Sequence, residues 1–90
     1  MQIEFDPDKR VKTLAERGLD FAHVAEIFSG AHLTREDTRE DYVEQRFQTA
    51  GWLGARIVIV VWTPRGEARR IISMRKANER ETAKLRSSLG

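Results

Sequence analysis

The first third of the chain carries the hydrophobic period of α-helices. Asp6 and Pro7 combine a capping carboxylate with a proline suited to the first helical position, and Gly18 can end the helix in a left-handed conformation. Helical spacings of three and four then recur in the apolar residues Phe21, Val24, Ala25 and Phe28. We therefore predict a helix that starts at Asp6-Pro7 and a second one over residues 21–29, after a short strand at residues 2–5.

The following part of the chain carries the pattern of β-strands. Residues 43–51 alternate partly, residues 56–62 are nearly continuous in β-branched side chains, and residues 68–75 are strand-like again. The turns are predicted at residues 52–54 and 63–66. Because residues 57–61 lack any polar position, they indicate a central strand, which requires helices on both faces of the sheet.

Two charged segments complete the pattern. Residues 35–41 contain six charges and no apolar side chain, which predicts an exposed loop or mobile flap. Residues 76–89 predict a basic, weakly anchored helix with a frayed end at residues 87–90. The expected fold is α+β: two N-terminal helices packed on a small antiparallel sheet of about four strands, with a C-terminal helix. Residues 1–90 are expected to form a single domain.

Composition narrows the functional classes. With 40% hydrophobic and 33% charged residues the chain predicts a folded, charge-rich module. The absence of cysteine excludes disulfides and thiolate chemistry, and the two histidines have no acidic neighbour at metal-ligand spacing, so no metal is expected. The glycines lack the spacing of nucleotide-binding loops, so no cofactor is expected either. No segment reaches the roughly 18 apolar residues of a membrane span, and the N-terminus lacks a secretion signal, which predicts a cytoplasmic protein.

The charge distribution points to an anionic ligand. Residues 1–64 carry 8 basic and 11 acidic residues, whereas residues 65–90 carry 8 and 3. Guanidinium forks match phosphate and carboxylate, and a nucleic-acid backbone supplies phosphates. Several cations could gather around one sheet edge and the start of the last helix: Arg46, Arg69, Arg70, Arg75, Lys76 and Arg80. The alternative is that they are ordinary edge-strand charges that suppress aggregation.

The register of these charges follows from strand geometry. Glu44 and Arg46 would share one face of their strand. Arg70 and Arg75 lie five residues apart, and so would point to opposite faces of a regular strand. The aromatic residues of these strands could stack on bases or fill the core: Tyr42, Phe47, Trp52 and Trp62.

The order of the motifs resembles the BrnT toxin family over nearly the whole chain. The matching segments are Phe5-Asp6-Pro7-Asp8-Lys9, Glu44-x-Arg46 with Gly51, the block Arg70 to Ala77, and Arg80-Glu81. The chain departs from the family at Phe5, Thr13, Glu16-Arg17 and Leu85, where the family usually carries Trp, Asn, Lys-His and a nearby Tyr.

The resemblance implies a RelE/ParE-like fold and a ribonuclease that halts translation. It also implies neutralisation by a BrnA-like ribbon-helix-helix antitoxin in a hetero-oligomer, which would reach operator DNA only through the antitoxin. The residues that carry over as catalytic are Lys9, Glu44, Arg46, Arg70 and Arg75. Those expected to bind RNA are Arg65, Arg69, Lys76 and Arg80.

The implied chemistry is metal-independent attack of an RNA 2′-hydroxyl on the adjacent phosphate. In this hypothesis Glu44 is the base, the arginines stabilise the phosphorane, and Lys9 or Lys76 donates the proton to the leaving oxygen. The alternative function is a non-catalytic module of the same fold that binds nucleic acid or protein.

Overall fold

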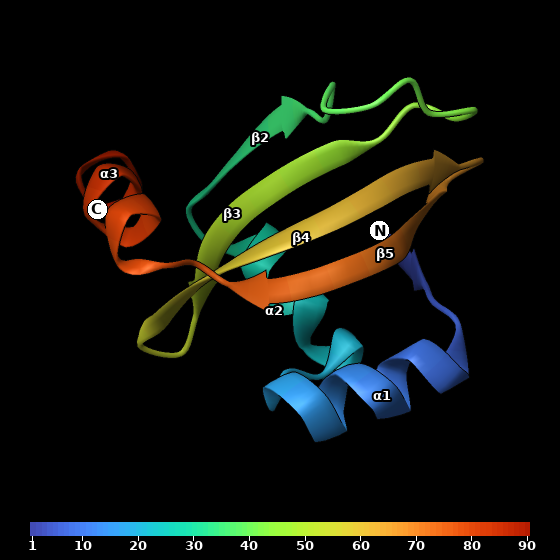
Figure 1. The fold of residues 1–90 in the computed structure, drawn as a ribbon, viewed down its shortest axis with the longest axis horizontal. Helices are drawn as coiled ribbons and strands as arrows, with labels where there is room; N and C mark the ends of the chain where they lie inside the picture. The colour runs from blue at the N-terminus through green and yellow to red at the C-terminus, as the bar shows by residue number, and fades with distance from the viewer.

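Five strands form one mixed sheet with helices on both of its faces (Figure 1). The computed structural model describes residues 1–90. The elements in chain order are β1 (Gln2–Glu4), α1 (Pro7–Arg17), the 3₁₀ helix η1 (Phe21–His23), α2 (Val24–Ser29), β2 (His32–Glu36), β3 (Phe47–Leu53), β4 (Arg56–Arg65), β5 (Ala68–Lys76) and α3 (Glu79–Leu89). The strand order is β1-β5-β4-β3-β2, and only the β1–β5 pair is parallel.

The first helix confirms the prediction from its caps. The Asp6 side chain accepts a hydrogen bond from the Asp8 amide at 2.9 Å, and Gly18 ends the helix with φ 68°. The second predicted helix is divided into η1 and α2, and Asp20 caps η1. Gly51 lets α2 cross β3 closely, because a Cβ atom there would lie 2.8 Å from Cγ2 of Ile27.

The larger part of the core lies between the sheet and the N-terminal helices. Its buried members are Leu19, Phe21, Val24, Ile27, Phe28, Val58, Val60, Trp62, Ile71 and Met74. Trp62 is central: its ring stacks on Phe47 at a centroid distance of 5.0 Å and meets Phe28 edge-on at 5.8 Å. Its indole N–H donates to Oγ1 of Thr49 at 2.8 Å. Trp62 and Phe47 are therefore core residues.

Helix α3 covers one end of the opposite face, as the apolar run in β4 predicts. It packs through Leu85 and Leu89 on a second, smaller core that includes Ala50, Ile57 and Ile59. A capping box between Asn78 and Glu81 fixes its start. The predicted frayed end is wrong, because α3 continues to Leu89 and this side chain is 6% exposed. None of the helices is long and apolar enough to cross a membrane.

The sheet differs from the predicted one in two ways. It has five strands rather than about four, and β1 pairs in parallel with β5 rather than antiparallel. Strand β2 lies partly inside the predicted loop at residues 35–41. All five of its residues are exposed at the sheet edge, and the segment lacks the apolar alternation that predicts a strand. Its pairing with β3 holds it in the sheet.

The strand boundaries were also misplaced by a few residues. β3 begins at Phe47 rather than Val43, so Glu44 and Arg46 precede the strand. Trp52 and Leu53 lie within β3, and Thr63 to Arg65 lie within β4. The turns are displaced to residues 54–55 and 66–67.

Candidate active site

A β-bulge decides which face of the sheet carries the arginines of β5. Val61 of β4 pairs with Ser73, but its neighbour Trp62 pairs with Ile71, so Ile72 is an extra residue in β5. The extra residue reverses the side-chain alternation, and Arg70 and Arg75 therefore share one face. The expectation that they point to opposite faces is wrong. Their common face is the one on which α3 packs, called the α3 face below.

The register of the five strands orders the α3 face into cross-strand rows. Arg70 lies opposite Thr63 and Glu4, and continuing the register by one residue places Arg46 and Asp37 in the same row. The next row consists of Arg35, Gln48, Val61 and Ser73. The third row consists of Leu33, Ala50, Ile59 and Arg75. At about 3.3–3.4 Å per residue, four strand positions separate Arg70 from Arg75 by about 13 Å, so their long side chains can meet one phosphate over the middle row.

Arg70 and Arg75 of β5 each form an ion pair with a carboxylate, and the two ion pairs differ in geometry. Nη1 of Arg70 lies 3.6 Å from a carboxylate oxygen of Glu4 in β1. Nη1 and Nη2 of Arg75 each donate to one carboxylate oxygen of Glu81 at 2.8 Å. This fork, together with the Asn78 amide, lowers the pKa of Glu81 to about 2, and Glu81 in turn raises the pKa of Arg75. Glu81 thus binds both Nη atoms of Arg75 in the bidentate geometry that a phosphate would use.

A second cluster lies at the end of the α3 face that α3 leaves uncovered. The Glu44 carboxylate is 3.7 Å from Nη2 of Arg46 and 3.7 Å from Nη2 of Arg65. The Arg46 guanidinium lies over the ring of Tyr42, 4.2 Å from its centroid, and its Nε is buried without a hydrogen-bond partner. Thr63 ties this loop to β4 by donating to the Gln45 carbonyl at 2.7 Å. The Glu44 carboxylate and the guanidinium groups of Arg46 and Arg65 therefore lie together, beside the row that contains Arg46 and Arg70.

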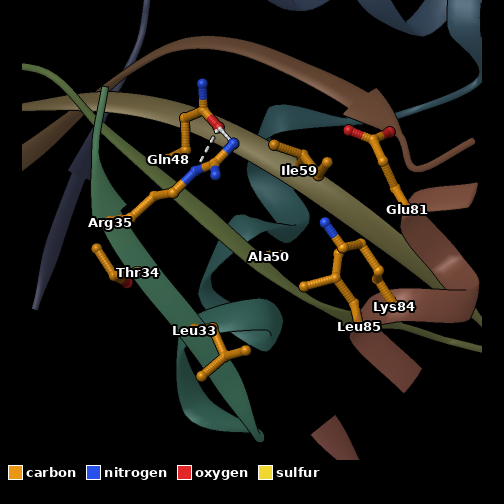
Figure 2. A pocket seen from close by; sticks show the side chains of 9 residues that line it. All are labelled: Leu33, Thr34, Arg35, Gln48, Ala50, Ile59, Glu81, Lys84 and Leu85. Carbon is orange, nitrogen blue, oxygen red and sulfur yellow. Dashed lines mark hydrogen bonds between the residues drawn. The ribbon is translucent and has the colours of Figure 1, made fainter. Parts of the chain in front are cut away.

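A groove lies between the edge strand β2 and α3 (Figure 2). Its volume is about 470 Å³, and its lining residues are Leu33, Thr34, Arg35, Gln48, Ala50, Ile59, Glu81, Lys84 and Leu85. In Figure 2 the Arg35 guanidinium meets the Gln48 side chain on one wall, where Nε and Nη2 donate to Oε1 at 3.3 and 3.2 Å. Glu81, the ion-pair partner of Arg75, stands on the opposite wall.

The structure brings together only part of the predicted set. Glu44, Arg46, Arg65, Arg70 and Arg75 lie on or beside the α3 face. Arg80 lies exposed in the first turn of α3.

The remaining predicted residues lie elsewhere, and the expected gathering of Arg69 and Lys76 with the other cations is wrong. Lys9 is exposed on α1, in the helical layer on the other side of the sheet. Arg69 packs over the rings of Phe28 and Trp62 at 4.3 and 4.7 Å. Lys76 pairs in register with Val58, so it lies on the same face, the one covered by α2.

Sequence reasoning missed four polar residues of the α3 face: Arg35, Asp37, Arg39 and Glu81. Three of them lie in the segment that was predicted to be a loop or flap. No local signal marked these three residues, because Arg35, Glu36 and Asp37 are all charged and show no alternation of apolar and polar positions. Glu81 stood in the quoted motif Arg80-Glu81 but could not be paired with Arg75 before α3 was placed.

The Arg75–Glu81 ion pair predicts a pH-dependent stability. Because folding lowers the pKa of Glu81 from an ordinary 4.5 to about 2, its stabilising effect is complete above about pH 4.5 and is lost as the pH falls through about 2. In urea unfolding, wild type should exceed Glu81→Gln in free energy of unfolding at neutral pH, with the difference shrinking below pH 4.5. Exposed Glu79 on the same helix provides the control variant Glu79→Gln. A difference that stays constant from pH 7 to 2 would contradict the assignment.

The α3 face can bind and stabilise a phosphodiester. Arg46 and Arg65 flank the Glu44 carboxylate. The face stays partly accessible, because Arg46, Arg70 and Arg75 keep 29%, 35% and 41% of their side-chain surface exposed. Fixed cations of this kind stabilise the extra negative charge of a pentacoordinate phosphorus. No three His, Cys, Asp or Glu side chains gather in a group that could hold a metal ion.

Comparison with known proteins assigns the family. No curated protein matches the chain. The family model described as the ribonuclease toxin BrnT of the type II toxin-antitoxin system matches residues 5–81. The match confirms the resemblance seen in the sequence. The chain therefore belongs to the BrnT family of ribonuclease toxins of type II toxin-antitoxin systems.

Proposed function

We propose that this BrnT toxin cleaves RNA on its α3 face without a metal ion. The observation that carries the proposal is the bulge in β5, which puts Arg70 and Arg75 on one face with Arg46 in the row of Arg70. Three guanidinium groups on one face supply the positive charge that phosphoryl chemistry requires. The toxin would act on cytoplasmic RNA and thereby inhibit translation.

The proposed reaction is an in-line transfer within the RNA chain. Glu44 takes the proton from the 2′-hydroxyl, whose oxygen attacks the adjacent phosphorus. Arg46, Arg70 and Arg75 stabilise the phosphorane, and the bond from phosphorus to the 5′-oxygen breaks. The products are a 2′,3′-cyclic phosphate and a 5′-hydroxyl. Lys9 and Lys76 lie away from the α3 face, so the departing 5′-oxygen takes its proton from water instead of from either lysine.

The test is cleavage by the purified toxin in the presence of EDTA. Toxin separated from its antitoxin should cut single-stranded RNA in EDTA and leave a 2′,3′-cyclic phosphate, which end-group analysis by mass spectrometry detects. A 2′-O-methyl RNA of the same sequence, which lacks the nucleophile, should stay intact. Cleavage that appears only when a divalent metal is added would refute the metal-independent mechanism. Binding of RNA without any cleavage would instead favour the non-catalytic module.

An antitoxin partner follows from membership of a type II toxin-antitoxin family. We propose that this partner is a BrnA-like ribbon-helix-helix protein that forms a hetero-oligomer with the toxin and contacts operator DNA through its own DNA-binding part. The unpaired outer edge of β2 and the adjoining apolar groove offer contact area beside the proposed RNA site.

A further inference from the structure

The segment between β2 and β3 contains a buried carboxylate that holds two neighbouring side chains. Asp37 is 4% exposed, and its amide donates to the Arg46 carbonyl at 2.8 Å, which extends the β2–β3 ladder by one pair. Its carboxylate accepts hydrogen bonds from Nε and Nη2 of Arg39 at 2.8 and 2.7 Å. It also accepts the Tyr42 hydroxyl at 3.2 Å and the Arg39 amide at 3.3 Å.

The two side chains of the Asp37–Arg39 ion pair differ strongly in solvent exposure. The Asp37 side chain is 0% exposed, whereas the Arg39 side chain is 59% exposed. A buried carboxylate is costly unless all its oxygens are paired, and here both oxygens are paired, chiefly by Arg39. This pairing lowers the pKa of Asp37 far below its usual range. Asp37 thus holds the Nε and Nη2 side of the Arg39 fork and leaves Nη1 free to bind a ligand.

Arg39 is held next to the proposed catalytic cations. Asp37 shares the row of Arg46 and Arg70, and Arg39 lines the same cavity of about 650 Å³ as Tyr42, Glu44 and Arg46. Tyr42, which Asp37 also orients, carries the Arg46 guanidinium on its ring.

We propose that Arg39 forms an additional phosphate-binding subsite for single-stranded RNA, beside Arg46, and that buried Asp37 is the residue that positions it. The inference rests on the proposed ribonuclease function and extends the binding surface by one phosphodiester, from β5 onto the loop between β2 and β3. Arg39 contacts the RNA backbone, and Asp37 acts only through Arg39 and Tyr42.

The test separates binding from cleavage by using 2′-O-methyl RNA, which binds but lacks the nucleophile. In fluorescence anisotropy, Arg39→Ala should weaken binding at least about tenfold, as for one charge-assisted hydrogen bond. It should also reduce the slope of log affinity against log salt by about 1, as for one lost phosphate contact. The control is Arg56→Ala, which removes an exposed arginine from the opposite face of β4, the one covered by α2, and should leave both quantities nearly unchanged.

The positioning role has its own readout. Asp37→Asn keeps the shape of the side chain but removes its charge, so Arg39 should lose its fixed orientation, and the KM for RNA cleavage should rise more than kcat falls. Arg39→Lys keeps the charge without the fork, and it should restore the salt slope but not the full affinity. Melting temperatures of the Arg39 variants close to that of wild type would show that the fold is intact.

Each result supports or overturns the subsite. Equal losses in Arg39→Ala and Arg56→Ala would show a general charge effect and overturn it. A loss of antitoxin binding with unchanged RNA affinity would also overturn it, because the surface would then serve a protein partner. If wild type binds 2′-O-methyl RNA through Arg39 but cleaves no RNA, the subsite stands and the proposed catalytic function fails.

Discussion

Replacing Arg70 or Arg75 with alanine is expected to lower RNA cleavage at least about tenfold, and by up to about a thousandfold if the lost guanidinium contacts the phosphorane directly. The two residues share the α3 face because of the bulge at Ile72, and each can approach a phosphate from one side of the Ser73 row. An interaction that strengthens only in the transition state should reduce kcat as well as kcat/KM. Single-turnover cleavage of a labelled RNA measures this effect without product release.

The control again is Arg56→Ala, which removes the same side chain from the other face of the sheet. Because Arg75→Ala also leaves Glu81 without its partner, Arg75→Lys and a comparison of melting temperatures distinguish a catalytic loss from a displaced α3. Cleavage at the wild-type rate by both alanine variants would remove Arg70 and Arg75 from the mechanism, whatever their effect on RNA affinity.

Trp62→Ala is expected to destabilise the fold by about 3–5 kcal/mol, which is typical of a large aromatic residue removed from a core. Trp62 is 8% exposed and joins α2, β3 and β5 through Phe28, Phe47 and Arg69. A domain of this size has little stability in reserve, so the variant should be largely unfolded at 37 °C. Urea denaturation followed by far-UV circular dichroism measures the loss.

Trp62→Phe is the matched variant for the aromatic contribution. It keeps an aromatic ring against Phe28 and Phe47 but removes the N–H that donates to Thr49, whose side chain is fully buried. The expected loss is smaller, about 1–3 kcal/mol for a buried group left with fewer partners. A loss of less than about 1 kcal/mol in Trp62→Ala would contradict the central position of this residue in the core.

Local signals were sufficient for the elements with strong caps or strong hydrophobic patterns. The Asp6-Pro7 start and the Gly18 end of α1 depend on backbone geometry within a few residues, so the sequence alone determined them. The unbroken apolar run of β4 determined that both faces of the sheet are covered. The family motifs determined the functional class, since their order is a property of the sequence.

The site depended on information that no local pattern contains. The sequence predicted that arginines form the site. The prediction wrongly grouped Arg69 and Lys76 with the other cations, and it left out Arg35, Asp37, Arg39 and Glu81. Arg69 packs on aromatic rings that come from α2 and β4, and Glu81 meets Arg75 only because α3 folds back over the sheet. Each of these contacts joins separate elements, so its existence follows from their packing.

The sequence by itself determined the caps of α1, the central strand β4, the basic character of the C-terminal part and the BrnT family. Only the tertiary structure decided that Arg70 and Arg75 share a face, that β2 extends the sheet, and that Asp37 is buried. The physical reason is that strand register is set by pairing between chain segments far apart in sequence. One extra residue in one strand reverses the direction of every side chain beyond it.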